Sequence, residues 1–316
     1  MINTFYYLVP IDYNNLENPK TEYFIIDSLR KKGLRIIPIF TFEEVKNDFK
    51  YDGIIFNSLK TILRNQKILT YAKKNNIPIF WWYFDTAKIR FTRERRVRKI
   101  AKQVSIFFNK DKDYFLSYLE SSINPVWLDQ GVPSVCKYTK IQEYSYDLSF
   151  FGSYEKSHSK RTNLLKELDD KYNLVIYSKD YEKFLSNGFH NVKPFVPVGK
   201  ISENIAKINL ILNGDYISTG CWSNRIHLVI GSSGFSLVEN VNGLENEYID
   251  NQHCIYFNKK SDLIKKIDFW LLDTNSNNRE RIRNQGFNHA HKQKSYKIKT
   301  AFFINEVTKF IDTQSN

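Results

Sequence analysis

The sequence contains little cysteine, and its cysteines lie far apart. Only Cys136, Cys221 and Cys254 occur among 316 residues, and their spacing matches neither a zinc-binding nor a redox motif. Their odd number and the lack of a secretory leader predict reduced thiols in a cytosolic protein. A disulfide framework and a zinc-binding module are therefore not expected.

Long hydrophobic runs are missing as well. The longest apolar segment, residues 77–84, contains a proline and is far shorter than the roughly 20 residues of a transmembrane helix. Internal repeats and low-complexity segments are also lacking. We therefore expect a cytoplasmic protein whose only contact with a membrane would be peripheral, at its inner face.

Acidic residues are outnumbered. The chain has 34 Asp and Glu against 47 Lys and Arg, a net charge of +13. Residues 1–140 hold 24 basic and 14 acidic residues, which gives +10, and the remainder holds 23 and 20, which gives +3. The first half therefore either faces an acidic partner or is simply well solvated.

Apolar residues are abundant enough for two cores. They make up 42% of the chain, and a chain of this length favours two domains of about 150 residues. Strand-like apolar runs alternate with helical periodicity in both halves, which predicts an α/β fold with parallel sheets. Residues 134–146 lack periodicity and mark the boundary. In such sheets, the loops at the carboxyl ends of the strands build the binding crevice.

The most informative stretch is residues 209–248. An apolar strand over residues 210–212 ends at Asn213-Gly214, and a short helix follows a polar loop, with Ser223 or Asn224 as its cap. Arg225 then lies in the first turn. Free N–H groups at a helix start and a forked guanidinium both suit phosphate oxygens. The alternative is an ordinary crossover with a solvent-facing arginine.

Several motifs resemble the CgeB-like branch of GT-B glycosyltransferases. They are Asn224-Arg225, the turn Ser233-Gly234-Phe235, the E-x-x-x-G-L-E pattern of residues 239–245, the D-x-S-F-x-G-S pattern of residues 147–153 with Arg161 after it, and the W-x-x-Q-G-x-P turn of residues 127–133. Many relatives carry a glutamate three residues after the arginine, where this chain has Leu228 beside His227.

The resemblance implies a GT-B fold, with two Rossmann-like domains facing across a cleft. Residues 1–140 would form the acceptor domain, residues 141–295 the nucleotide-sugar donor domain, and residues 296–316 a helix that crosses back to the first domain. It also implies a set of donor-binding residues, which are Gly152, Ser153, Arg161, Tyr177, Val198, Asn224, Arg225, His227, Glu239, Gly243, Leu244 and Glu245.

The activity implied is transfer of a sugar from a nucleotide diphosphate sugar to an acceptor hydroxyl, in cell-surface glycan or glycoconjugate synthesis. The acceptor would be a glycan, a lipid-linked compound or another hydroxyl compound. We expect neither a bound metal nor a cofactor, since no Asp-x-Asp pair is placed like that of the metal-dependent enzymes.

Two carboxylates of the first half are candidates for catalysis. Asp12 and Asp85 each follow an apolar strand, and Asp85 closes a strand so apolar that a low dielectric would raise its pKa and favour base chemistry. The alternative for Asp85 is a helix cap, because Thr86-Ala87 could open a helix.

Residues 88–102 carry eight basic residues and one acid, Glu94. The spacing predicts an amphipathic helix whose cationic face holds Arg95, Arg98, Lys99 and Lys102. Such a face could meet anionic lipid, an acidic glycan acceptor or nucleic acid. The alternative is a solvated outer helix.

Two other functions fit parts of the sequence. One is a nucleotide-sugar epimerase on the same fold, which would need no acceptor. The other is a non-catalytic nucleic-acid-binding protein that uses the basic helix. Nucleic acid is the less expected partner, because the chain has no recognised nucleic-acid module and its aromatic residues occur in core-like runs.

Overall fold

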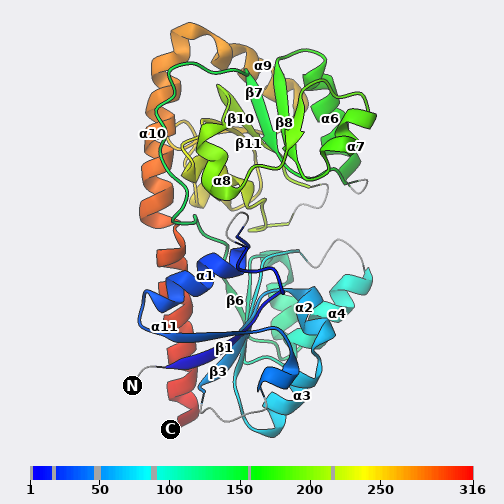
Figure 1. Cartoon of the computed structure of the whole chain (residues 1–316), viewed down its shortest axis with the longest axis vertical. Helices are drawn as coiled ribbons and strands as arrows, with labels where there is room; N and C mark the ends of the chain where they lie inside the picture. Colours follow the sequence, from blue (N-terminus) through cyan, green and yellow to red (C-terminus); the bar gives the residue numbers. More distant parts are fainter. Residues whose placement is uncertain are drawn as a thin grey trace. The chain divides into compact units, whose positions relative to one another are not determined.

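The computed structural model describes residues 3–15, 19–45, 51–86, 91–155, 158–214 and 218–315. The chain divides into two compact units, unit 1 with residues Met1–Gly131 and Tyr296–Asn316, and unit 2 with residues Val132–Ser295 (Figure 1). This division falls after Gly131, earlier than the boundary expected after residue 140. Each unit contains a six-stranded sheet, and all the strand pairings described are parallel. The predicted α/β fold with two parallel sheets is confirmed.

The sheet of unit 1 has the strand order β2-β1-β3-β4-β5-β6. Its strands are β1 Thr4–Leu8, β2 Arg35–Ile39, β3 Gly53–Phe56, β4 Ile79–Tyr83, β5 Ile106–Asn109 and β6 Pro125–Trp127. Its helices are α1 Thr21–Arg30, α2 Leu59–Arg64, α3 Lys67–Lys74, α4 Phe91–Ala101, α5 Phe115–Leu119 and α11 Tyr296–Ser315.

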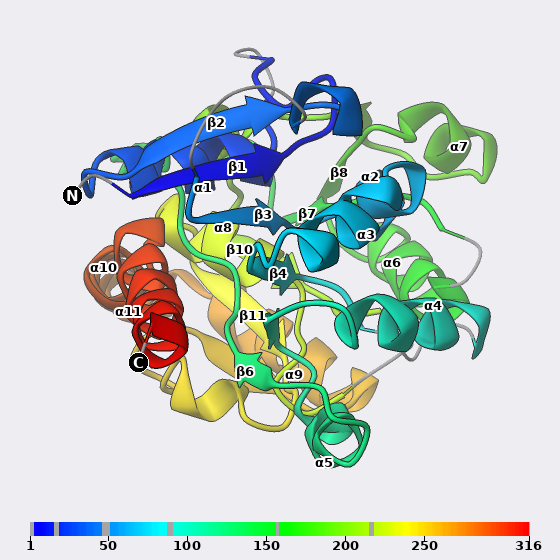
Figure 2. The ribbon, with the colours of Figure 1, turned by 90° about the horizontal axis from the view of Figure 1, so that it is seen from below.

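Side chains of these strands alternate between two faces of the sheet, as the period of a strand requires. Trp81 and neighbours on its face pack with buried residues of α2, α3, α4 and α5. Trp82, on the opposite face, stacks on Phe303 of α11 at 5.4 Å between ring centroids. Figure 2 shows α1 and α11 on one side of this sheet and α2, α3 and α4 on the other. The last helix of the chain therefore completes the core of unit 1.

The sheet of unit 2 has the order β12-β11-β10-β7-β8-β9. Its strands are β7 Leu148–Phe151, β8 Leu174–Ser178, β9 Val192–Pro194, β10 Ile208–Ile211, β11 Ser236–Glu239 and β12 Ile255–Phe257. Its helices are α6 Ser159–Asp169, α7 Tyr181–Ser186, α8 Arg225–Gly231, α9 Lys260–Leu271 and α10 Ser276–Gln293. None of the helices in the described ranges is long and apolar enough to cross a membrane.

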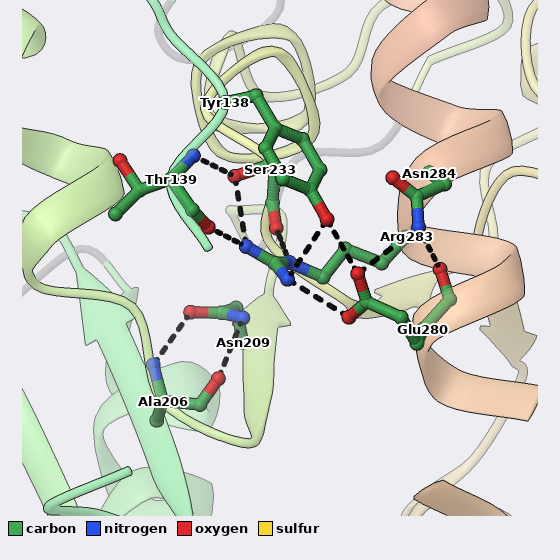
Figure 3. A network of polar contacts seen from close by, with 8 residues as sticks. All are labelled: Tyr138, Thr139, Ala206, Asn209, Ser233, Glu280, Arg283 and Asn284. Carbon is green, nitrogen blue, oxygen red and sulfur yellow. Dashed lines mark hydrogen bonds and ion pairs between the residues drawn. The ribbon is translucent and has the colours of Figure 1, made fainter. Parts of the chain in front are cut away.

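The turn that resembles the family motif is fixed by Arg283 of α10 (Figure 3). Its Nε donates to the carbonyl of Ser233, and Nη2 donates to the carbonyl of Thr139 and, at 3.1 Å, to Ser233 Oγ. Ser233 has a left-handed backbone with a φ of 62°, which is uncommon for serine. A Cβ on the following Gly234 would meet Val229 Cγ1 at 2.6 Å. Close packing thus explains why a small residue and a glycine stand between α8 and β11.

Candidate functional site

Strands β7 and β10 are neighbours in the sheet of unit 2, although β8 and β9 lie between them in sequence. The chain leaves β7 toward one edge of the sheet and continues from β10 toward the other edge. This is a topological switch point, where α/β proteins bind ligands at the carboxyl ends of the strands. Gly152 and Ser153 follow β7, and Asn213 and the loop before α8 follow β10.

Two arginines meet at this point over one aromatic ring. The guanidinium carbon of Arg161 lies 5.5 Å from the centroid of Phe150, and that of Arg225 lies 5.0 Å from it. Arg161 is buried in the first turn of α6, and its Nη2 donates to the carbonyl of Ser153 at 2.9 Å. Arg225 opens α8 and is partly buried. The alternative of a solvent-facing arginine is therefore wrong.

The surroundings of Arg225 disfavour its positive charge. Burial first, and then the neighbouring cation of Arg161, lower the pKa of Arg225 to about 9, although Glu155 and Glu239 oppose this. Arg225 Nε is buried and has no hydrogen-bond partner among the residues that the structure describes. The site therefore has two cations and one unsatisfied hydrogen-bond donor, Arg225 Nε. A bound anion would accept a hydrogen bond from this donor and offset the positive charge.

Asn224, the residue before Arg225, also has an unsatisfied hydrogen-bond acceptor in its side chain. It stands at the cap position of α8, but its side chain makes no capping bond, and its Oδ1 is buried without a partner in the described ranges. Ser223 Oγ instead accepts from Arg225 N at 3.4 Å. Of the two expected caps, Ser223 is therefore the one that contacts the helix start.

A side chain at Gly152 would disturb this site. Its Cβ would lie 2.7 Å from the ring of Phe150 and 3.2 Å from Arg225 Nη1. We expect Gly152→Ala to displace the ring beneath both guanidinium groups, to destabilise the protein by about 1–3 kcal/mol and to weaken nucleoside diphosphate binding by roughly tenfold, about 1.4 kcal/mol. Calorimetry of binding and thermal unfolding measure the two effects.

The control for Gly152→Ala is Gly199→Ala. The nearest atom to a Cβ at Gly199 is Val135 Cβ at 3.7 Å, an ordinary contact. Affinity and melting temperature should then stay near those of the wild type. If Gly152→Ala bound the diphosphate as well as this control, close backbone approach at Gly152 would play no part in binding.

Asn213 connects the site to β11. Its backbone N–H donates to Glu239 Oε2 at 2.7 Å, its Nδ2 donates to the Glu239 carbonyl at 3.0 Å, and its Oδ1 accepts from Ser223 N at 2.8 Å. These bonds hold both ends of the loop that precedes Arg225. From the sequence, Asn213 was expected only to end the strand in a turn. The sequence feature that could have indicated this role is an asparagine placed between a buried strand and a glycine.

Two of the expected donor-binding side chains lie in the core of unit 2. His227 is fully buried, with Nδ1 2.9 Å from the hydroxyl of Tyr248. Leu244 is also fully buried, and its carbonyl accepts from Tyr256 at 3.0 Å. Both residues therefore pack within the core and support neighbouring loops.

Gly243 and Glu245 form the turn before Leu244. Gly243 has a left-handed backbone, with a φ of 92°, which glycine adopts without steric cost. Its N–H donates to Glu245 Oε2 at 2.9 Å, and Glu245 is exposed. The glycine of the family-like pattern is thus explained by its backbone.

Tyr177 and Val198 lie on the β8 side of the sheet. Tyr177 is buried and stacks on Phe151 at 4.9 Å, and its burial raises its pKa to about 12. This tyrosine therefore belongs to the core. Val198 is partly buried and starts a 3₁₀ helix, Val198–Glu203.

The candidate carboxylates of unit 1 are exposed. Asp12 pairs with Lys20 at 2.9 Å, and Asp85 pairs with Arg93, whose Nε also donates to the hydroxyl of Tyr83 at 2.9 Å. The side chain of Asp85 is 62% exposed, so the expectation of a low dielectric around it is wrong. The strand before Asp85 is buried, but the chain reaches the protein surface where the strand ends, and this exposes Asp85. The proposed helix at Thr86-Ala87 falls partly outside the described residues.

Unit 1 contains buried acids that the sequence analysis missed. Asp111 and Asp129 follow β5 and β6 and are fully buried, and Asp129 lies 3.7 Å from Lys110. Glu22 in the first turn of α1 is also buried, and this burial, the largest effect, raises its pKa. Their positions at strand ends and at a helix start were visible in the sequence, but their burial was not.

We expect Glu22→Gln to stabilise the protein near neutral pH. Because the pKa of Glu22 is raised by folding, the folded chain holds this proton more tightly than the unfolded chain, and stability is lost as pH rises above about 4.3. Glutamine carries no such charge. The melting temperature of the variant should therefore exceed that of the wild type at pH 7.5, and the difference should shrink toward pH 4.

The control for Glu22→Gln is Glu120→Gln, since Glu120 is exposed in the same unit. It should change the melting temperature little at either pH. An equal effect of Glu22→Gln at pH 4 and pH 7.5 would contradict a role for the buried charge.

The described part of the basic helix is α4, Phe91–Ala101, and the expected start at Lys88 lies outside the described residues. Arg95, Lys99 and Lys102 are exposed, as expected. Arg98 is different: its Nε is 3.1 Å from Glu94 Oε1, and its Nη2 donates to Ser117 Oγ at 2.7 Å. Its assignment to an anion-binding surface is thus wrong, because this arginine joins α4 to α5.

One group of side chains in the described residues has the geometry of a metal site. Ligand atoms of Asp169, Asp170 and His190 lie within 4.8 Å of one another. The ammonium group of Lys166 pairs with both aspartates, at 3.5 and 2.9 Å. A lysine therefore already supplies positive charge here, and we assign no metal to this group.

Comparisons with known proteins bear on the family and the fold. Residues 160–305 match the family described as glycosyl transferase-like, whereas no curated protein matches the chain. Among solved structures, the fold is similar to that of Anabaena HepE in complex with UDP and glucose (TM-score 0.71, 8% identity, 97% of this chain and 100% of that chain).

Two further structures are similar over nearly the whole chain. Sucrose-phosphate synthase of Thermosynechococcus elongatus has a TM-score of 0.73 at 7% identity, with 98% of this chain and 100% of that chain covered. The DNA-modifying enzyme β-glucosyltransferase has a TM-score of 0.65 at 15% identity, with 98% and 99% covered. The resemblance found in the motifs is thus confirmed: the chain has the GT-B fold, and its residues 160–305 match the glycosyl transferase-like family.

Proposed function

We propose that this glycosyltransferase moves a sugar from a UDP-sugar to a hydroxyl group of an acceptor. The observation that carries the proposal is the pair Arg161 and Arg225 over Phe150, at the switch point of the unit 2 sheet. Solved structures of similar fold contain UDP with glucose, or UDP-glucose, which supports uridine as the nucleoside and glucose as the first sugar to test.

The diphosphate gains negative charge as the bond to the sugar breaks. Fixed cations beside the diphosphate lower the barrier to transfer, because their attraction to the phosphates is stronger in the transition state than in the ground state. Arg225 and Arg161 would supply these cations, and the partly buried setting of Arg225 strengthens its attraction to an anion. The N–H groups after β7, at Gly152 and Ser153, would approach the same phosphates.

The sugar would lie toward the ends of β10 and β11. Glu239 ends β11 and is fixed by Asn213, and Glu245 is exposed in the next turn. Carboxylates accept hydrogen bonds from sugar hydroxyls, so these two residues would orient the donor sugar.

The acceptor would approach the carboxyl edge of the unit 1 sheet. Asp85 follows β4 and Asp12 follows β1, and an exposed carboxylate at this edge can take the proton of an attacking hydroxyl. We propose a glycan, lipid-linked or other hydroxyl acceptor, in synthesis of cell-surface glycans or glycoconjugates.

The test has two stages. Thermal unfolding is first measured with a series of nucleoside diphosphates, since a ligand at 100 times its Kd stabilises the native state by about 2.7 kcal/mol. UDP is expected to give the largest shift. The protein is then incubated with UDP-glucose and candidate acceptors, and release of UDP together with a glycosylated product is expected.

Two results would contradict the proposal. Conversion of the nucleotide sugar without an acceptor and without release of UDP would indicate an epimerase. If no nucleoside diphosphate or nucleotide sugar raised the melting temperature, the protein would not have the proposed donor site.

A further inference from the structure

Helices α2, α3 and α4 of unit 1, together with the residue that follows α4, carry a dense set of exposed basic side chains. We call this set the basic face, and its members are Lys60, Arg64, Lys67, Lys73, Lys74, Arg95, Arg96, Lys99 and Lys102. The described residues of the segment that holds them, 58–86 and 91–104, include only two acids, Asp85 and Glu94. Positive charge therefore dominates this part of unit 1.

Those two acids are already paired. Asp85 pairs with Arg93, and Glu94 pairs with Arg98. No member of the basic face forms an ion pair with another residue in the part of the chain that the structure describes. Charges of one sign gathered without counter-charges repel one another and attract an anionic surface from a distance.

The basic face also contains a hollow of about 390 Å³ between α3 and α4. Its polar part is lined by Arg96 and Lys99 of α4 and by Gln66 and Thr70 on the side of α3. The rest of the lining comes from Leu63, Leu69, Ile100 and Gln103. Two cations beside amide and hydroxyl groups form a lining that suits a phosphate group, since each can donate hydrogen bonds to its oxygens.

Apolar side chains project from the helix next to α4. Leu116 and Leu119 of α5 are 76% and 57% exposed, and Arg98 ties α5 to α4 through Ser117. Basic residues beside exposed leucines are typical of surfaces that lie on the headgroup region of a membrane.

We propose that the basic face binds an anionic membrane surface, with a lipid phosphate group in the hollow. Nucleic acid fits less well, because single-strand binding relies on exposed aromatic platforms, and Tyr71 of α3 packs against Phe42 instead. The basic face would hold unit 1 at the surface of the bilayer.

The proposal is independent of the donor site, since the residues that carry it lie in unit 1. Cosedimentation with vesicles of phosphatidylcholine alone, and of phosphatidylcholine with phosphatidylglycerol, tests it on the full chain. The wild type should bind only the anionic vesicles, and raising the salt concentration should weaken binding steeply.

The decisive variant is Arg96→Glu with Lys99→Glu, which reverses both charges in the hollow. Each basic residue near an anionic bilayer changes the affinity by roughly fivefold, so the double reversal should lower vesicle binding at least tenfold. The matched control is Lys265→Glu with Lys292→Glu, two exposed lysines of unit 2. This control has the same net charge and should keep most of the vesicle binding. Both proteins should keep the wild-type melting temperature.

Three outcomes would overturn the proposal. The first is equal binding of the wild type to neutral and anionic vesicles, or none to either at low salt. The second is an equal loss in the two double variants, which would indicate net charge alone. The third is tighter binding to RNA, DNA or an acidic polysaccharide than to anionic vesicles at the same salt, which would assign the basic face to that partner.

Discussion

Arg225→Met is expected to weaken UDP binding by roughly ten- to a hundredfold. Charge-assisted hydrogen bonds contribute about 1.5–3 kcal/mol each, and the buried Nε of Arg225 has no other partner in the described residues. Methionine keeps much of the side-chain volume but can donate no hydrogen bond. Isothermal titration calorimetry of the wild type and the variant with UDP measures the difference.

Turnover of the same variant should fall further than its affinity. The diphosphate becomes more negative as the sugar leaves, so an interaction with Arg225 is stronger in the transition state than in the complex. Arg225→Lys should recover only part of the loss, because an ammonium group cannot hold two phosphate oxygens as a planar guanidinium does.

The ligand-free variant should be more stable than the wild type. Folding lowers the pKa of Arg225, so the folded chain holds its proton less tightly than the unfolded chain does. The charged side chain is therefore a cost to stability at every pH below about 9. Arg225→Met removes that cost and the repulsion with Arg161, and the melting temperature at pH 7.5 should rise.

Arg281→Met is the matched control for Arg225→Met. Arg281 is exposed on α10 of the same unit and contacts Gln285, so this variant removes one positive charge away from the site. Its UDP affinity should equal that of the wild type. If both variants lost affinity equally, general electrostatic attraction would explain the binding. If neither did, Arg225 would not hold the diphosphate.

Asp85→Asn is expected to lower the rate of transfer by roughly a hundredfold or more while leaving UDP affinity unchanged, since a general base typically contributes a factor of about 10² to 10⁴. The amide has nearly the shape of the carboxylate but cannot take a proton from the acceptor hydroxyl. The ion pair with Arg93 is exposed, and its loss should cost at most about 1 kcal/mol of stability. Steady-state kinetics with saturating UDP-sugar measure the effect.

Asp27→Asn controls for the loss of an exposed, ion-paired acid in the same unit. Asp27 pairs with Lys31 at 2.7 Å on α1, and its replacement should leave turnover near that of the wild type. Should Asp85→Asn also turn over normally, Asp85 would only position Arg93, and the base would have to be sought among other residues at the carboxyl edge of the sheet, such as Asp12.

The strands that frame the donor site could be predicted from the sequence, because each is a short apolar run followed by a turn. The run at residues 210–212 overlaps β10, and the run before Gly152 is β7. The resemblance motifs then indicated Arg161 and Arg225. Local pattern was sufficient because each of these features depends on residues close together in the chain.

The geometry around Phe150 could not be predicted. The contact of Arg161 and Arg225 over one ring depends on β10 lying beside β7, and strand order is not encoded in local periodicity. The partial burial of Arg225 depends on the same packing, and the burial of Glu22 depends on tertiary packing within unit 1. The prediction that Arg98 belongs to an anion-binding surface failed for a related reason, because its partner Ser117 lies on another helix.

A crystal structure with bound UDP would show whether Arg161 and Arg225 hold the donor diphosphate. We expect phosphate oxygens within hydrogen-bond distance of Arg225 Nε and of the Arg161 guanidinium group, with the β-phosphate near the backbone of Gly152. UDP bound elsewhere, with Arg225 Nε still unpaired, would contradict it.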